Sequence, residues 1–354
     1  MRKKLILSAV SILLTLLAAE AALRILGIGA IGRGSAWFAG GNHQRFLVQP
    51  DPVTGYTLRP RFHGHEIALG GEFNVPVAID GEGLRVQPHP APFSPSILIA
   101  GDSMTFGEGV PEDGTYAARL ERRLGVRVYN AGVPGYGSAQ MLGRLRRYLP
   151  ELQPELVVMT LSPLWDRQRI AAPFAYKDGY IVGRDYVDRL VLLDGNLYLR
   201  ETKLPVLGTA TAYAERTSNL ARIALPTLAG AARGLFLHPR QAPATAADVE
   251  PTVRNLQAAR QLAGQAGARF LAVLVDDRGA EFRRERLMVQ SRLQALGIPF
   301  VAADDLIPAA RWPSLRYPLD THWNAAGHAA MGRTLAPRLK PLLASPPATP
   351  PLSG

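Results

Sequence analysis

The chain of 354 residues contains no cysteine. Disulfide bonds and thiolate metal sites are therefore excluded, while an oxidising and a reducing compartment both remain open. Acidic residues are also scarce, since 29 Asp and Glu stand against 40 Lys and Arg and leave a formal net charge of +11. Such a balance favours anionic partners such as polysaccharide, lipid or nucleic acid. No nucleic-acid-binding motif or internal repeat is present, so we interpret the excess as a solvated arginine-rich surface and expect no nucleic-acid partner.

A long apolar run occurs only at the N-terminus. Three basic residues, 2–4, precede the run Leu5–Ala19, and a more broken apolar stretch continues to Ile28. Within that stretch Glu20 and Arg24 are four residues apart, a spacing at which side chains on a helix pair. We interpret residues 1–30 as an uncleaved signal anchor or a cleavable signal peptide, and we favour the anchor, with residues 5–28 in the inner membrane. The basic flank then places the rest of the chain in the periplasm or another extracytoplasmic space. A buried helix of a cytosolic protein is the weaker alternative.

The remainder divides into a short β-rich part and a longer α/β part. Residues 46–95 combine turn signals with alternating apolar residues and end in a proline-rich linker, which indicates a β-rich lead-in. From residue 96 to 344, short apolar runs alternate with helical patterns. We expect strands at 97–100, 126–129, 156–161, 270–275 and 298–302, with helices at 116–124, 138–149, 253–266, 281–296 and 325–343. Fully apolar strands that alternate with helices predict a parallel sheet covered on both faces.

Two segments depart from this rhythm. Residues 167–245 contain the turn signals Asp178-Gly179 and Asp194-Gly195 between β-type segments, followed by a helical piece near 218–235. We interpret them as an insertion that caps the site. The proline-rich tail 345–354 is expected to be disordered.

Two motifs together contain the chemical parts of a serine hydrolase. Ser103 follows an apolar strand and Gly101-Asp102, while Asp320 and His322 are two residues apart near the C-terminus. A serine nucleophile needs a general base, and an imidazole needs a carboxylate that fixes its tautomer. Ligands bind at the carboxyl ends of strands in an open parallel sheet, which is where Ser103 is expected. Taken singly, the serine is more typical of a helix cap and the aspartate of the start of a helix.

The chain resembles the SGNH (GDSL-type) hydrolase superfamily in several blocks. These are Ile97–Val110, the glycine-rich stretch Asn130–Ser138, and Asp320-Thr321-His322-Trp323-Asn324. Membrane-anchored bacterial members are similar also at Asp80–Arg85 and in the N-terminal helix. The resemblance implies a three-layer α/β/α sandwich with a parallel sheet. It further implies a catalytic triad of Ser103 as nucleophile, His322 as base and Asp320 as its orienting carboxylate. The backbone N–H groups of Ser103 and Gly135 would form part of the oxyanion hole.

Two departures from the family pattern bear on activity. The third block usually supplies an asparagine to the oxyanion hole, but Trp165 stands in its place, so Trp165 or Ser162 becomes the candidate donor. The neighbouring Asp166 matches the aspartate of that block. The close spacing of Asp320 and His322 is similar to that of alginate-type polysaccharide O-acetyltransferases, whose motif also reads Asp-Thr-His-Trp.

We therefore expect an exported serine esterase that forms an acyl-enzyme on Ser103 and removes O-acetyl groups from an envelope or extracellular polysaccharide. One alternative is a polysaccharide O-acetyltransferase that uses the same triad. A second is a non-catalytic carbohydrate-binding protein on this scaffold. The expected partners are an acylated carbohydrate or other ester and, through the N-terminal helix, the membrane. No cofactor and no metal site are expected, because His63 and His65 have no third ligand nearby in the sequence.

Overall fold

The computed structural model describes most of the chain. The described residues are 2–25, 35–38, 47–68, 72–87, 94–177, 180–183, 190–193, 196–199, 214, 218, 220, 221, 224, 244–275, 279–318 and 322–344. The chain forms two compact units. One comprises 1–35, 68–72 and 185–242, and the other comprises 36–67, 73–184 and 243–354.

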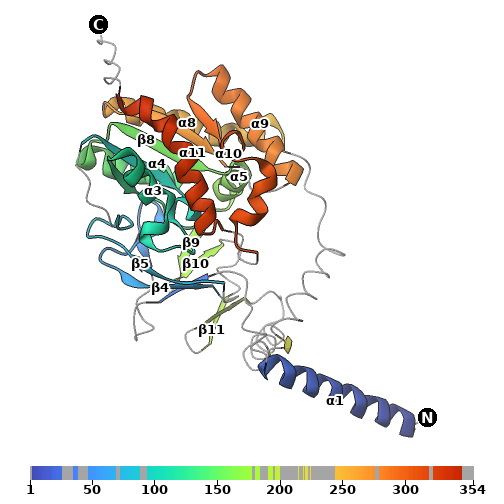
Figure 1. The fold of residues 1–354 in the computed structure, drawn as a ribbon. Helices are drawn as coiled ribbons and strands as arrows, with labels where there is room; N and C mark the ends of the chain where they lie inside the picture. The colour runs from blue at the N-terminus through green and yellow to red at the C-terminus, as the bar shows by residue number, and fades with distance from the viewer. Residues whose placement is uncertain are drawn as a thin grey trace. The chain divides into compact units, whose positions relative to one another are not determined.

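The second unit is built on a five-stranded parallel sheet (Figure 1). Its strands are β6 (Ser96–Gly101), β7 (Arg127–Asn130), β8 (Leu156–Leu161), β13 (Arg269–Leu274) and β14 (Phe300–Ala302). Their order is β14-β13-β8-β6-β7, and every neighbouring pair is parallel. The predicted strands thus pair as one sheet, and the predicted fold class is confirmed.

Both faces of this sheet are buried, as continuous apolar strands require. Along β8, Val157, Met159 and Leu161 belong to one core cluster while Leu156 and Val158 belong to the other, because successive side chains point to opposite faces. The first cluster includes side chains of α4 (Ser138–Leu152), α8 (Ala246–Gln265) and α9 (Gly279–Ala295). The second includes side chains of α3 (Tyr116–Leu124) and α11 (Ala325–Ala344). The result is a three-layer sandwich.

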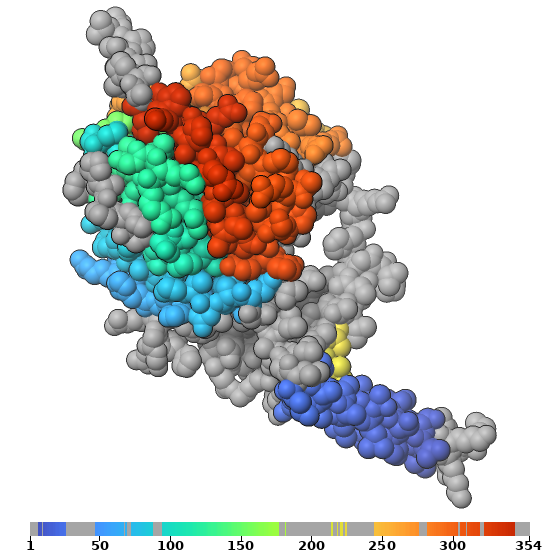
Figure 2. Space-filling model, viewed as in Figure 1, coloured from blue at the N-terminus to red at the C-terminus, as the bar shows by residue number. Residues whose placement is uncertain are grey.

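The helices begin and end where local chemistry directs. Helix α3 starts after Thr115, whose side chain accepts a hydrogen bond from the Ala118 N–H, and stops at Gly125, whose φ is 67°. A positive φ suits glycine, which has no Cβ to clash. Helices α3 and α11 pack against each other and form adjoining green and red surfaces in Figure 2.

The lead-in is made of short antiparallel strands. Strands β2 (Val48–Asp51) and β3 (Gly55–Leu58) form one hairpin. Strands β1 (Ser35–Phe38), β4 (His63–Ala68) and β5 (Asn74–Ala78) form a three-stranded sheet in the order β1-β4-β5. Several apolar side chains of this part, including Tyr56, Leu58 and Ile79, join the core cluster of the α4 face. The lead-in and the α/β sandwich therefore share a hydrophobic core.

Arg85 fastens the end of the lead-in to the loop that follows β6. Its buried guanidinium donates to the carbonyl oxygens of Phe106 (2.8 Å), Gly107 (2.6 Å) and Val110 (2.6 Å). These carbonyls follow the four-residue helix α2 (Ser103–Phe106). The conformation of the chain beside Ser103 thus depends on a side chain from outside the sandwich.

The segment expected to be an insertion is described only in parts. It overlaps helix α5 (Pro163–Ala171), which starts within the sandwich, and is followed by the antiparallel pair β9 (Phe174–Lys177) and β10 (Tyr180–Gly183). Strands β11 (Leu190–Leu193) and β12 (Asn196–Leu199) form a further antiparallel pair in the other unit. The expected turns 178–179 and 194–195, most of the helical piece 218–235 and the tail 345–354 lie outside the described residues.

Short helices complete the chain between the sheet and its last helix. They are η1 (Glu112–Gly114), α10 (Ala303–Leu306) and η3 (Ala309–Leu315). The last two separate β14 from the segment of His322, where the sequence suggested only a loop.

Helix α1 (Arg2–Ile25) is long and apolar enough over Ile6–Ile25 to cross a membrane. This is a statement of length and composition, which a signal sequence near an N-terminus satisfies equally. Its apolar side chains, such as Ile6 and Leu7, are exposed. Arg24 donates to Glu20 over 2.7 Å, so the predicted pair is formed.

Candidate active site

Ser103 stands at the carboxyl end of β6, where α2 begins. The side chain of Asp102 caps this short helix by accepting a hydrogen bond from the Met104 N–H over 3.0 Å. A Cβ on Gly101 would lie 2.0 Å from Thr105 Oγ1, so only glycine allows the chain to turn this tightly. The sharp turn leaves Ser103 facing a cavity.

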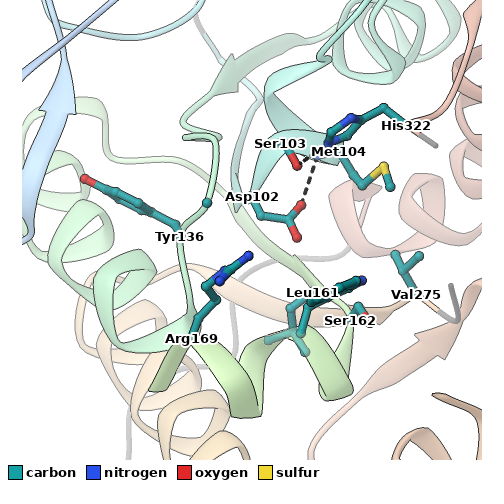
Figure 3. Close-up of a pocket in the computed structure, with 11 residues that line it drawn as sticks. Asp102, Ser103, Met104, Tyr136, Leu161, Ser162, Arg169, Val275 and His322 are labelled. Carbon is teal, nitrogen blue, oxygen red and sulfur yellow. Dashed lines mark hydrogen bonds between the residues drawn. The ribbon is translucent and has the colours of Figure 1, made fainter. Parts of the chain in front are cut away.

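His322 reaches Ser103 from the other end of the chain. Its Nε2 lies 2.8 Å from Ser103 Oγ, and Figure 3 shows the two side chains facing each other across this hydrogen bond. The histidine is held by its backbone, because its carbonyl accepts the Tyr317 N–H over 2.9 Å. Asn324 then caps α11 by accepting the N–H groups of Ala326 and Gly327. The two predicted residues are therefore brought into hydrogen-bond contact across the edge of the sheet.

Asp320 lies outside the described residues. Its expected role as the carboxylate that orients His322 stays a prediction.

Two buried glutamates beside this pair escaped the sequence analysis. Glu108 Oε2 lies 3.6 Å from His322 Nε2. Glu66, on β4, accepts the Gly109 N–H over 2.8 Å, and its other carboxylate oxygen is buried with no hydrogen-bond partner in the described part of the chain. Burial raises the pKa of Glu66 to about 8, and the charge of Glu108 adds to the effect, against the opposing pull of the Gly109 N–H and Arg85. Glu66 thus holds its proton at neutral pH, beside a carboxylate that faces the histidine.

The glycine-rich loop after β7 closes over the same cavity. Its first residue, Asn130, donates to the Thr105 carbonyl over 2.9 Å and accepts the Gly132 N–H over 3.1 Å, which fixes the loop to α2. Gly135 has φ +77°, and a Cβ there would lie 2.2 Å from a ring carbon of Phe174. Gly135 lines the cavity, and the assignment of its N–H to an oxyanion hole stays a prediction.

Ser162 and Trp165, the two candidates for the missing oxyanion donor, both line the cavity. The buried hydroxyl of Ser162 has no hydrogen-bond partner among the described residues. The Trp165 side chain is 38% exposed and packs edge-on against Phe282, with ring centroids 5.8 Å apart. An unused hydroxyl at this position favours Ser162 as the donor.

Asp166 is buried and is not among the residues that line the cavity. Its carboxylate accepts the Ser138 N–H over 2.5 Å and the Ser138 hydroxyl over 2.9 Å, at the start of α4. Burial raises the pKa of this carboxyl group, against the opposing effect of the hydrogen bonds from Ser138. Asp166 therefore fixes two helices to each other, and its match to the family block reflects structure.

The cavity has a volume of about 190 Å³. It is lined by Asp102, Ser103, Met104, Gly135, Tyr136, Leu161, Ser162, Trp165, Arg169, Val275 and His322. Arg169 is a further residue that the sequence analysis missed. Its only sequence signal is its position one turn after Trp165 on α5. Among the described residues, no group of three or more His, Asp or Glu side chains is arranged to hold a metal ion.

A serine hydroxyl bonded to an imidazole Nε2, at the carboxyl edge of a parallel sheet, is the arrangement of a serine hydrolase. Residues 99–162 match the model of the GDSL-like Lipase/Acylhydrolase family. The stretch that carries Ser103 is therefore similar to a GDSL-like lipase/acylhydrolase, as the resemblance of its sequence blocks predicted, and the fold and site define an ester-hydrolysing enzyme.

Solved structures of similar proteins share little sequence with this chain. TesA is 18% identical, with 70% of this chain and 99% of that chain covered and a TM-score of 0.42. The psychrotrophic esterase EstA from Pseudoalteromonas sp. is 13% identical, with 71% and 100% covered and a TM-score of 0.41. The acetyl xylan esterase AlAXEase is 11% identical, with 69% and 99% covered and a TM-score of 0.39. A comparison with curated proteins finds no match.

Proposed function

We propose that the protein is a serine esterase in which Ser103 is the nucleophile, His322 the general base and Asp320 the carboxylate that orients the base. The observation that carries the proposal is the 2.8 Å separation of His322 Nε2 from Ser103 Oγ. That distance lies within the range over which a base removes a proton from a hydroxyl.

In the first half of the reaction, His322 Nε2 takes the Ser103 hydroxyl proton as Oγ bonds to the ester carbonyl carbon. The electron pair of the carbonyl double bond moves to its oxygen, which becomes the oxyanion. The bond to the alcohol oxygen then breaks, and the alcohol leaves with the proton held on Nε2. In the second half, a water attacks the acyl carbon, gives its proton to Nε2 and displaces Ser103, which recovers the proton.

The oxyanion is stabilised by the backbone N–H groups of Ser103 and Gly135 and by the Ser162 hydroxyl. Ser162 is supported by its place in the cavity and by its lack of another partner in the described part of the chain. Hydrogen-bond donors aimed at developing charge in a dry pocket give some of the largest single contributions to catalysis.

The substrate that we propose is an acylated envelope or extracellular polysaccharide, from which the enzyme removes O-acetyl groups. The support is the apolar N-terminal helix behind basic residues 2–4, which suits export and anchoring in the inner membrane with the catalytic unit in the periplasm. Transfer of the acyl group to a sugar hydroxyl is the second candidate, favoured by the Asp-Thr-His-Trp motif at 320–323. Both outcomes begin with the same acyl-enzyme and differ in whether water or a sugar accepts the acyl group.

The decisive experiment labels the full-length protein, in detergent, with a fluorophosphonate and measures hydrolysis of phenyl acetate. We expect the wild type to be labelled and active, the Ser103→Ala variant to be neither, and the Ser314→Ala variant to match the wild type. Ser314 is a suitable control because its exposed hydroxyl bonds only the Arg311 carbonyl. Equal inertness of wild type and Ser103→Ala towards label and ester would support the non-catalytic carbohydrate-binding alternative. Faster acetyl release with an oligosaccharide acceptor would favour the transferase.

A further inference from the structure

Arg169 places a cation in the same cavity as Ser103 and His322. It extends from α5, and Figure 3 shows its side chain pointing into the cavity toward Asp102. Arg169 also lines a second hollow of about 480 Å³ whose other lining residues include Thr54, Gln140, Phe174 and Tyr176. The guanidinium therefore stands where the catalytic cavity meets an adjoining hollow large enough for a further part of a substrate.

The Arg169 guanidinium has no hydrogen-bond acceptor among the residues that the structure describes. Within the described part of the chain it makes no hydrogen bond and no ion pair. By contrast, Arg167 on the same helix bonds both carboxylate oxygens of Glu285 at 3.0 and 2.7 Å, and Arg85 donates to three carbonyls. An arginine carries five N–H donors and stays protonated. A half-buried arginine without an acceptor in the described part of the chain therefore has N–H donors available to bind a ligand.

Packing holds this guanidinium in place. Its central carbon lies 3.5 Å from the centroid of the Phe174 ring and 5.8 Å from that of Trp165. The stem is confined as well, because a Cβ on Gly137 would lie 2.8 Å from the Arg169 Cβ. A side chain that is fixed before binding loses little conformational entropy when a ligand arrives.

Asp102, the one acidic residue among the described residues that line the cavity, does not neutralise it. Asp102 attracts Arg169 through space, but its carboxylate is used to cap α2 through the Met104 N–H. Burial lowers the pKa of Arg169, while the charge of Asp102 opposes this effect. The free-energy cost of removing the guanidinium from water is offset best by hydrogen bonds to an anion that arrives with the substrate.

We propose that Arg169 is a specificity-determining residue that binds an anionic group, a carboxylate or a phosphate, on the ester substrate. The inference rests on the proposed function, since it concerns which esters Ser103 attacks. A guanidinium fork matches the two oxygens of either anion, and such charge-assisted hydrogen bonds are among the stronger ones in proteins.

The test compares matched esters whose charge differs. Phenyl acetate is paired with 4-acetoxybenzoate and 4-acetoxyphenyl phosphate, which carry the anion on the alcohol, and phenyl butyrate with monophenyl succinate, which carries it on the acyl chain. We expect the full-length protein to favour at least one anionic ester by about tenfold or more in kcat/KM. Arg169→Gln should lower kcat/KM for that ester by about 10- to 100-fold, mainly through KM, and leave the neutral partner within about threefold. Arg169→Lys should retain part of the preference.

Arg146→Gln is the matched control, because Arg146 is an exposed arginine of α4 that does not line the cavity. It removes the same charge and should leave every ratio unchanged. The inference is overturned if the wild type prefers no anionic ester, if Arg146→Gln acts as Arg169→Gln does, or if Arg169→Gln slows neutral and anionic esters equally. In those cases Ser103-dependent turnover persists, so the proposed function survives. Absence of Ser103-dependent turnover of every ester would instead defeat the proposed function, and this inference with it.

Discussion

Two buried carboxyl groups near the Ser103–His322 pair differ greatly in the hydrogen bonds that their oxygens accept. Asp166, next to β8, accepts hydrogen bonds from the N–H and the hydroxyl of Ser138. Glu66, on β4, accepts one hydrogen bond, from the Gly109 N–H, and its other carboxyl oxygen has no partner in the described part of the chain. The charge of Glu108 also acts on it. The first arrangement is typical of a structural link. The second keeps a protonated carboxyl group beside a carboxylate that faces the histidine, which is typical of a site that moves protons.

The contrast teaches that burial alone does not mark a functional acid. Burial raises the pKa of both groups, yet only Glu66 belongs to a cluster that reaches His322, through Glu108 at 3.6 Å. The region around β8 supplies packing and a hydroxyl without a partner in the described part of the chain, whereas Ser103, after β6, bonds His322 and lies near the carboxyl groups of Glu66 and Glu108. Substitutions of single residues in the two regions should therefore show which side chains serve activity and which serve stability.

The largest effect on activity is expected at Ser162, which would give the β8 region a residue that takes part in catalysis. Ser162→Ala should lower kcat by about 100- to 1000-fold with little change in KM, because an oxyanion donor acts mainly in the transition state. Steady-state kinetics with phenyl acetate measure this. Trp165→Phe, which removes the indole N–H and keeps a smaller aromatic ring, is the matched control and should retain most activity. The reverse result, with Trp165→Phe impaired and Ser162→Ala active, would transfer the role to the indole.

A smaller effect is expected at Asp166, and it should fall on stability. Asp166→Ala removes the acceptor of the Ser138 N–H and hydroxyl and leaves these buried donors unsatisfied, at a cost of about 2 kcal/mol in the free energy of unfolding. Equilibrium denaturation in detergent measures the change. Asp305→Ala, at a group with an exposed side chain, serves as the control. A large loss of kcat without loss of stability would contradict the structural assignment.

A third effect is expected at Glu66, where stability should depend on pH. The unfolded chain releases this proton near the ordinary value of 4.5, while the folded protein keeps it to about 8. Between these values the folded state binds more protons, so the free energy of unfolding falls as pH rises, by up to about 1.4 kcal/mol per pH unit. Glu66→Gln should flatten that slope, as seen in thermal unfolding at a series of pH values.

The control for this effect is Glu151→Gln, an exposed glutamate on α4. It should keep the wild-type slope. An unchanged slope in Glu66→Gln would show that Glu66 does not titrate as its burial implies.

Much of the sandwich could be predicted from the sequence because its strands are short, wholly apolar runs. Leu156–Leu161 was predicted as a strand and forms β8, and residues 116–124, between Thr115 and Gly125, form α3 as predicted. These boundaries are fixed by local patterns, which a sequence displays directly. The start of α5 was missed as an element because residues from 167 were taken as the insertion, whereas the helix begins at Pro163 and is continuous to Ala171.

Only those residues of the site that lie in a recognisable sequence motif could be predicted. Ser103 follows Gly101-Asp102 and His322 precedes Trp323-Asn324, so both were found. Glu66 and Arg169 stand in unremarkable sequence, and their roles arise from contacts made by packing. The Gly109 bond to Glu66 spans 43 positions, and the Arg169 stack on Phe174 depends on a turn of the chain after α5. No local pattern encodes such contacts.

The three hydrogen bonds from Arg85 set a lower limit on how short a fragment of this chain can be and still hold Ser103 in place. The stretch that matches the family model, 99–162, contains Ser103 and the loop to Val110, but three hydrogen bonds to that loop come from Arg85. A protein trimmed to start at β6 would lose them. The Phe106 and Gly107 carbonyls would keep longer bonds from Asn130 and the Val110 N–H, while the loss of the donor to the Val110 carbonyl would cost about 1–3 kcal/mol. The stretch that matches the family model is thus shorter than the part of the chain that is needed to hold Ser103 in place.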